Sequence, residues 1–204
     1  MQIELLFITP EATKLIEKAG RTSYMSHFRI TEDSHKAFCK KLIDLGHESP
    51  LEHAYATFSI SGISRACSHQ LVRHRLASYT QKSQRHTEEK DFPTYTPPSI
   101  ANEVSGWQTY SRAIDHCKEA YKSLVAMGIP WEDARMVLPN AQTTDIVMTA
   151  NFREWRHVIK LRVSKDAQME IRFLIYRILE ILIEKYPSIF EDLIKPEEEV
   201  FDSE

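Results

Sequence analysis

Residues 73–85 read RHRLASYTQKSQR, and the interpretation of the 204-residue chain depends on them. Four permanent cations stand there among serine, threonine and glutamine, with only three apolar residues. No Asp or Glu occurs from residue 53 to residue 87, although the formal net charge of the protein is −3. Packing of a core does not call for such a composition. The segment is therefore predicted to hold an anion.

The first three residues of the segment suggest how an anion would be held. Arginine presents a planar fork of donors that fits phosphate or carboxylate at two points, and it stays charged at any working pH. Arg73 and Arg75 flank His74, so we expect one ligand with several oxygens, or two ligands that meet. The alternative is a solvated basic face, which is the usual role of a run of charges.

The last five residues of the segment suggest a nucleotide. Ser83 and Arg85 stand at alternate positions of a predicted loop, so that a hydroxyl and a guanidinium can reach the same phosphate. Gln81 and Gln84 each carry a donor and an acceptor, which suits the edge of a nucleobase.

The order of these residues resembles the signature of the flavin-dependent thymidylate synthases, which is Arg-His-Arg, seven residues, Ser, any residue, Arg. The chain matches it at Arg73, His74, Arg75, Ser83 and Arg85. Other blocks resemble the family in the same order, over roughly residues 21–190: HESPLEH at 47–53, ARMVLP at 134–139, NFR at 151–153, Arg162, and AQME at 167–170. The chain departs from the family at Thr80-Gln81, where Asn-Glu is common, and at His157, where the family has Asn.

The resemblance implies a reaction and its partners. The reaction is reductive methylation of deoxyuridylate (dUMP) to thymidylate (dTMP), with methylenetetrahydrofolate as the carbon donor. FAD, once reduced by NADPH, gives the hydride, and no cysteine attacks the pyrimidine. The family forms a homotetramer with shared active sites. We therefore expect small-molecule substrates, and neither nucleic acid nor membrane as a partner.

The resemblance also implies a role for individual residues. Arg162 is the expected catalytic residue, because a fixed cation can stabilise negative charge that develops on the uracil ring. Its alternative role is that of a cation near a helix C-terminus, where the helix dipole favours it. The residues implied for the nucleotide are Gln70, Leu71, Val72, Arg73, Gln81, Lys82, Ser83, Gln84, Arg85, Arg135 and Arg162. Those implied for FAD are Ser49, Arg73, His74, Arg75, Gln81, Asn151, Phe152, Arg153 and His157.

Composition sets wider limits. A chain of 204 residues with 42% apolar and 27% charged residues is ordinary for one globular domain, so we predict a single domain over residues 1–204. The sequence shows no charged-then-apolar leader and no apolar run near the ~20 residues that cross a bilayer, which predicts a cytoplasmic protein.

Cysteine, histidine and glycine exclude several kinds of site. Three scattered cysteines without a CxxC pair predict neither a disulfide framework nor a zinc knuckle, and Cys39, Cys67 and Cys117 are expected to pack as small hydrophobes. His47 and His53 lack the spacing of HExxH, so no metal is expected. Five widely spaced glycines give no GxGxxG or Walker loop, which leaves phosphate binding to side chains and to the helix N-terminus at Asn151.

Periodicity and turn residues predict an α+β domain with a mixed, largely antiparallel sheet flanked by long helices. Strands are expected at 2–8, 54–61 and 142–150, and Pro-containing loops at 47–53 and 91–99. In the first half of the chain, helices are expected from Thr9-Pro10 to a stop at Gly20, from 31 to a stop at Gly46, and at 63–74. In the second half, they are expected at 103–126 with a buried apolar stripe, and in a short segment that carries Arg135 after Gly128. Two more are expected, one at 151–163 with an Asn151/Glu154 capping box and one that begins at an Asp166 cap and ends before Pro187.

Two other functions remain open at this point. The first is a nucleic-acid-binding module that uses the acid-free residues 53–87, although the pI of about 6.3 and the scarcity of aromatic residues beside Tyr79 argue against it. The second is a flavin enzyme that acts on another nucleotide. A flavin absorbance spectrum distinguishes the module from either enzyme, and a thymidylate assay distinguishes the two enzymes.

Overall fold

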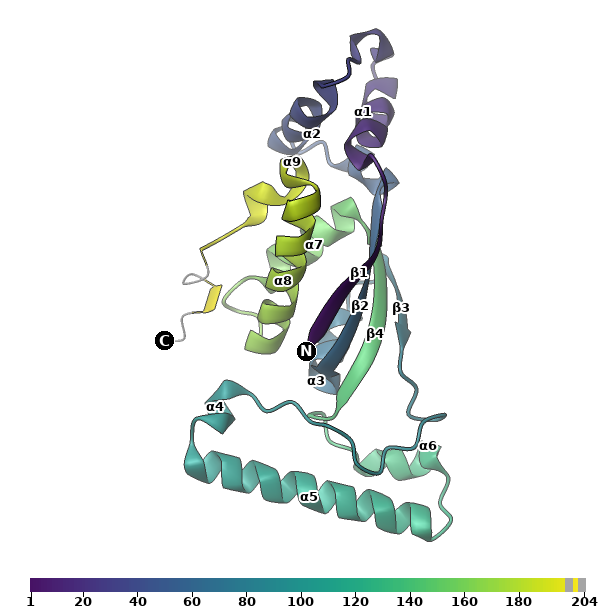
Figure 1. Ribbon diagram of the computed structural model, residues 1–204, viewed down its shortest axis with the longest axis vertical. Helices are drawn as coiled ribbons and strands as arrows, with labels where there is room; N and C mark the ends of the chain where they lie inside the picture. Colours follow the sequence, from purple (N-terminus) through teal and green to yellow (C-terminus); the bar gives the residue numbers. More distant parts are fainter. Residues whose placement is uncertain (197–199, 202–204) are drawn as a thin grey trace. The chain divides into compact units, whose positions relative to one another are not determined.

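A computed structural model of the protein describes residues 1–196 and 200–201, and it contains a four-stranded sheet (Figure 1). The strands pair in the order β1-β2-β4-β3. The amide of Phe152 donates to the carbonyl of Ala54, and that of Gly62 donates to the side-chain Oδ1 of Asp145, so β2 and β4 run antiparallel. The predicted α+β class is confirmed. The strands are β1 (Gln2–Ile8), β2 (Tyr55–Ser64), β3 (Ala77–Gln81) and β4 (Thr143–Asn151).

The residues group into two compact units that divide the long strands between them. The first unit comprises Met1–Gln2, Ile60–Arg73 and Thr80–Ile146, and the second comprises Ile3–Ser59, His74–Tyr79 and Val147–Glu204. The 73–85 segment therefore contributes to both units, with His74 in the second and Arg85 in the first.

The second unit buries one face of its strands against helix α7 (Phe152–Arg162), which packs in turn on α8 (Met169–Lys185). Side chains of β2 alternate as predicted, with Ala56 and Phe58 fully buried. The ring of Phe58 meets that of Trp155 edge-on, with 5.2 Å between centroids, and Trp155 Nε1 donates to the carbonyl of Ala56 at 3.1 Å. This contact fixes α7, and with it the site residues on that helix.

The remaining segments of the second unit are short. Gly46 ends α2 (Ser34–Asp44) as predicted, with a φ of 69° that suits glycine and with its amide bonded to the carbonyl of Ile43. The predicted Pro-containing loop at 47–53 holds a 3-10 helix. These segments are α1 (Ala12–Thr22), 3-10 helices at His27–Arg29, Ser49–His53 and Glu191–Leu193, α2 (Ser34–Asp44) and α9 (Pro187–Phe190).

Two predicted helix ends in this unit are wrong. Helix α1 begins at Ala12 and continues through Gly20. The glycine does not end the helix but allows close packing, because a Cβ there would lie 2.9 Å from the ring of Phe38. The N-cap of α8 is Gln168, not Asp166, whose own amide is bonded to Ser164.

The first unit holds α3 (Arg65–Leu71), α4 (Pro98–Ala101), α5 (Val104–Ala126), α6 (Trp131–Ala134) and a 3-10 helix at Arg135–Val137. Figure 1 shows α5 as one long rod, and Gly128 follows it with φ of 82° as the predicted break. Helix α3 is shorter than predicted. Of the predicted stripe on α5, Ile114 and Tyr121 are buried, whereas Trp107 is 47% exposed.

The three cysteines form no disulfide, and all lie in the described part of the chain. Cys39 and Cys67 are fully buried, as expected of small packed side chains. Among the described residues, none of the helices combines the length and the apolar character that a membrane span needs.

Candidate active site

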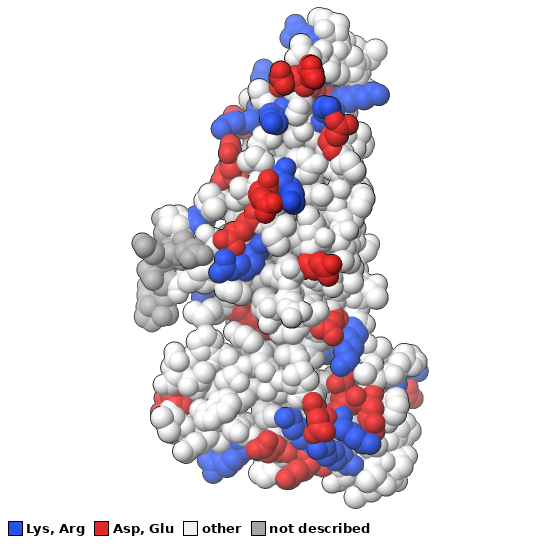
Figure 2. Space-filling model, viewed as in Figure 1, with Lys and Arg blue, Asp and Glu red and all other residues white. Residues whose placement is uncertain are grey.

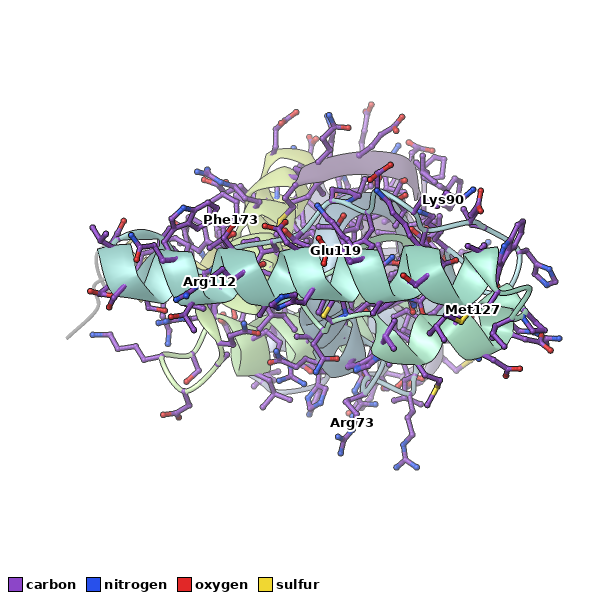
Figure 3. The ribbon with its side chains drawn as sticks, turned by 90° about the horizontal axis from the view of Figure 1, so that it is seen from below. Arg73, Lys90, Arg112, Glu119, Met127 and Phe173 are labelled. Carbon is purple, nitrogen blue, oxygen red and sulfur yellow. The ribbon has the colours of Figure 1, made fainter. Side chains whose placement is uncertain are left out.

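The signature begins with alternating exposure. Arg73 and Arg75 are exposed, and Figure 3 shows Arg73 pointing away from the protein. His74 between them is only 5% exposed. The two arginines therefore face solvent or a ligand, while the imidazole points inward. We call residues 74–79 the histidine end of the segment and residues 80–85 its arginine end.

The histidine end is held by hydrogen bonds within the second unit. Arg162, in the last turn of α7, donates from Nε to His74 Nε2 at 2.9 Å. Tyr79 donates its hydroxyl to the carbonyl of His74 at 3.0 Å. The rings of His74 and His157 meet edge-on with 6.0 Å between centroids. The structure therefore brings together three residues that the sequence assigned separately: His74, His157 and Arg162.

A buried carboxylate completes this group. Glu154 Oε1 lies 3.9 Å from His74 Nδ1, and both side chains are almost fully buried. Burial, together with the charges of Arg162 and His157, lowers the pKa of His74 to about 4. Burial also raises the pKa of the Glu154 carboxyl. At neutral pH the imidazole is uncharged, so its contact with Glu154 is not an ion pair.

The N-terminus of α7 opens into a hollow of about 480 Å³. Asn151 caps the helix, because its side-chain oxygen accepts the amide of Glu154 at 2.8 Å, as predicted. Arg153 is exposed there and pairs with Glu52. The hollow is lined by Glu48, Glu52, Leu76, Asn151, Arg153, Glu154 and His157. A guanidinium, a helix N-terminus and an imidazole thus face one space together with three carboxylates, and the first three groups can donate to a phosphorylated ligand.

Two residues implied for FAD lie in other surroundings. The side chain of Phe152 is fully buried, with its ring 5.2 Å from that of Phe190 and 5.4 Å from that of Tyr186, so only its backbone faces outward. Ser49 is exposed at the start of a 3-10 helix.

The arginine end lies in the first unit, where its polar side chains have protein partners. Gln81 Nε2 donates to the hydroxyls of Ser68 at 2.9 Å and Thr144 at 3.3 Å. Gln84 Nε2 donates to the side-chain oxygen of Gln142 at 2.6 Å. These bonds orient both amides before any ligand binds.

The cations of the arginine end are paired with acids. Lys82 Nζ lies 2.9 Å from the buried carboxylate of Glu89, and Arg85 Nε lies 2.9 Å from Glu132. The Arg85 pair is open to solvent, with 58% of the Arg85 side chain exposed. Arg135 donates from Nε to the backbone carbonyl of Glu132, so Arg85 and Arg135 both contact Glu132. Ser83 accepts the amide of Arg85 at 3.2 Å.

The remaining nucleotide candidates are on or next to α3. Leu71 is fully buried, and Val72 is 37% exposed directly before Arg73. Gln70 Nε2 donates to the carbonyl of Ala66 one turn earlier. Of these three side chains, that of Leu71 packs in the core.

Sequence reasoning assigned no site role to Glu154, Tyr79, Glu89 or Gln142. Glu154 follows Asn151 by three residues, and this spacing predicted a capping box in which the Glu side chain turns back to the helix end. Its side chain faces His74 instead. Gln142 is fully buried, and its Nε2 has no hydrogen-bond partner in the described structure. A local sequence pattern could not reveal the contact of Glu154 with His74 or that of Gln142 with Gln84, because the partners lie far apart in sequence.

On the face drawn in Figure 2, basic and acidic side chains lie interspersed. Within residues 1–196 and 200–201 there is no cluster of three His, Cys, Asp or Glu that could hold a metal ion.

A second hollow, of about 780 Å³, lies in the second unit beside α1 and α2. Its lining combines aromatic and basic side chains, including Phe28, Phe38, Arg29 and Lys41. It contains none of the residues that the signature implies.

The chain is similar to known proteins over most of its length. The family model described as thymidylate synthase complementing protein matches residues 4–188. The flavin-dependent thymidylate synthase of Geobacter sulfurreducens is 43% identical over 200 residues, which are 94% of this chain and 86% of that protein. That of Pyrococcus abyssi is 40% identical over 190 residues, 88% of this chain and 78% of the relative. The crystal structure of thymidylate synthase X from Helicobacter pylori with FAD and dUMP has a TM-score of 0.80 at 23% identity, over 96% of this chain and 100% of that one, and this likeness shows the fold.

Proposed function

Because this chain belongs to the thymidylate synthase complementing proteins, the family of the flavin-dependent thymidylate synthases, we propose that it converts dUMP to dTMP with methylenetetrahydrofolate as carbon donor. FAD reduced by NADPH is the proposed source of the hydride. The observation that carries the proposal is the family match over residues 4–188, which contains every candidate site residue from Ser49 to Arg162.

The hollow at the start of α7 supports FAD as the cofactor. It presents Asn151, Arg153 and His157 beside a helix N-terminus, and the donors of these side chains together with the positive end of the helix dipole favour a pyrophosphate. We propose that they hold FAD with Ser49, Arg73, His74, Arg75, Gln81 and the backbone of Phe152. Bound FAD supplies hydride transfer, which no side chain of the protein can provide.

Arg162 is the proposed catalytic residue. Its Nε is committed to His74, so the plane of the guanidinium is fixed before substrate binds. A preorganised cation costs no reorganisation when charge develops on a bound ring, and this is the property that electrostatic catalysis needs. Arg162 would stabilise the negative charge that spreads over the uracil when C5 acts as the nucleophile.

The remaining nucleotide contacts follow from the arginine end. Arg85, Arg135 and Ser83 offer two guanidinium groups and a hydroxyl to the phosphate, while Gln81 and Gln84 offer amides to the base. Gln70, Leu71, Val72, Arg73 and Lys82 complete the proposed set. Family membership supports a homotetramer in which this end reaches the active site of a neighbouring subunit. We propose that the enzyme acts in the cytoplasm.

The surroundings of the cysteines support a reaction without a sulfur nucleophile. Burial raises the pKa of the Cys39 thiol to about 12, which leaves almost no thiolate at neutral pH. Cys67 is fully buried on α3, and Cys117 lies along α5.

The test is a spectrum followed by an assay. We expect the purified protein to show flavin absorbance and to form dTMP only when dUMP, methylenetetrahydrofolate and NADPH are all present. A Cys39→Ala/Cys67→Ala/Cys117→Ala triple variant should keep that activity. Flavin absorbance without dTMP would instead favour a flavin enzyme that acts on another nucleotide. Colourless protein with salt-steep oligonucleotide binding would favour the nucleic-acid module.

A further inference from the structure

The carboxylate of Glu154 is buried beside His74 on the side opposite Arg162, and the family resemblance gives it no role. We propose that Glu154 is a positioning residue that keeps the proton of His74 on Nδ1, so that Nε2 accepts from Arg162 and aims the guanidinium. The proposal rests on the proposed function, because it takes Arg162 to act on the nucleotide.

The hydrogen bond between His74 and Arg162 determines which nitrogen of the imidazole carries the proton. A guanidinium can only donate, so the His74 Nε2 that lies 2.9 Å from Arg162 Nε must present a lone pair. An imidazolium carries N–H on both nitrogens and would set two donors against each other. His74 must therefore be neutral, with its proton on Nδ1.

The opposite edge of the His74 ring, at Nδ1, faces a carboxylate. Glu154 Oε1, at 3.9 Å, is the acid that faces Nδ1, and an ionised carboxylate can only accept. Its negative charge favours a proton on the nitrogen that points toward it. Because both side chains are about 5% exposed, water screens this attraction little. The group thus runs from carboxylate to Nδ1–H, and from Nε2 to the guanidinium.

Neighbouring groups agree with this arrangement. The titratable groups around His74 are Glu154, Arg162, His157 and Tyr79. Burial and the Arg162 charge hold the pKa of His74 at about 4, well below neutral pH. Burial raises the pKa of the Tyr79 phenol, and the charge of Glu154 raises it further, so Tyr79 stays a neutral donor to the His74 carbonyl.

A purely structural role is separable, because the helix cap uses the backbone of Glu154. Asn151 accepts the amide of Glu154 and not its side chain. Replacing the side chain therefore leaves the cap in place. In Glu154→Gln, the amide can still turn its oxygen, the negative end of its dipole, toward Nδ1. In Glu154→Leu, the side chain has no oxygen to present to Nδ1.

The experiment compares these two variants with Glu17→Gln, a matched change of another buried carboxylate that lies outside the site. The flavin-loaded full chain, labelled with ¹⁵N in histidine, is studied by NMR, and His74→Gln assigns the His74 signal. Wild type and Glu154→Gln should show the Nδ1–H tautomer, and Glu154→Leu a mixture. The kcat of Glu154→Leu should fall about tenfold or more, on the scale of lost orienting partners, with the Kd for dUMP little changed.

Two results would overturn the inference. One is a Glu154→Leu protein that keeps the Nδ1–H tautomer. The other is normal kcat in Glu154→Leu with only a lowered Tm, like that of Glu17→Gln, because that would mean a structural role. Wild type that makes no dTMP would overturn the proposed function instead, and the tautomer is measured independently of that activity.

Discussion

At the histidine end of residues 73–85, an uncharged imidazole is 5% exposed and fixes Arg162. At the arginine end, Arg85 is 58% exposed and pairs with Glu132 in solvent. A hydrogen bond in a dry environment fixes the orientation of the two groups that it joins. An exposed ion pair is screened by water and salt, and its members exchange readily with solvent. The comparison teaches that one short segment can use its donors in two ways. The histidine end should control the rate of the reaction, and the arginine end should control the affinity for the nucleotide.

The sharpest test of this division removes Arg162. We expect Arg162→Ala to keep flavin absorbance and to lose turnover by about a hundredfold or more, on the scale of a lost oxyanion donor. Lys165→Ala, which removes an exposed cation three residues along the chain, is the control and should have normal kcat. Near-normal turnover of Arg162→Ala, measured as dTMP formed per flavin, would refute its catalytic role.

The second test uses pH to probe burial at the histidine end. His74 titrates near 6.5 when unfolded and near 4 when folded, so between these values the unfolded chain binds more protons. Stability should therefore fall as pH falls from 7 to 5, by about 2 kcal/mol from this residue. The raised pKa of Glu154 acts in the opposite direction and offsets part of this loss.

The measurement is denaturant unfolding at pH 7 and pH 5, at one fixed protein concentration because an oligomer is expected. His74→Gln, which cannot titrate, should show a smaller difference between the two pH values than wild type. An equal difference in both proteins would mean that His74 is not desolvated as described.

The third test moves to the arginine end. Arg85→Ala should weaken dUMP binding by about tenfold, the loss of one charge-assisted hydrogen bond, while kcat at saturating dUMP changes little. Arg112→Ala, an exposed arginine on α5 labelled in Figure 3, is the control. Calorimetric titration with dUMP gives both affinities. Unchanged affinity in Arg85→Ala would remove that residue from the site.

Sequence could predict the features whose cause is local. Alternation along β2, the stop at Gly46 and the Asn151 cap each depend on residues within a few positions, and all are confirmed. The signature likewise predicted the family, because its spacing is read directly from the chain. These are the cases in which backbone chemistry and side-chain period agree.

Sequence could not predict the features that depend on distant partners. Gly20 looked like a helix stop, but the ring of Phe38 on another helix decides its role. The side chain of Glu154 faces His74, which lies eighty positions earlier, and no local pattern encodes that contact. The roles that the resemblance assigns to individual site residues stay predictions.

The smallest expected effect comes from Glu132, whose change would sharpen the contrast between the two ends. Both members of the Arg85–Glu132 pair are about half exposed, so Glu132→Gln should change the free energy of unfolding by less than about 1 kcal/mol. Because Arg85 loses a competing anion, dUMP affinity should rise about twofold, most clearly at low salt. Glu119→Gln on α5, also exposed, is the matched control for net charge. If Glu132→Gln instead lowered kcat and left affinity unchanged, the arginine end would govern rate, and the division between the two ends would be wrong.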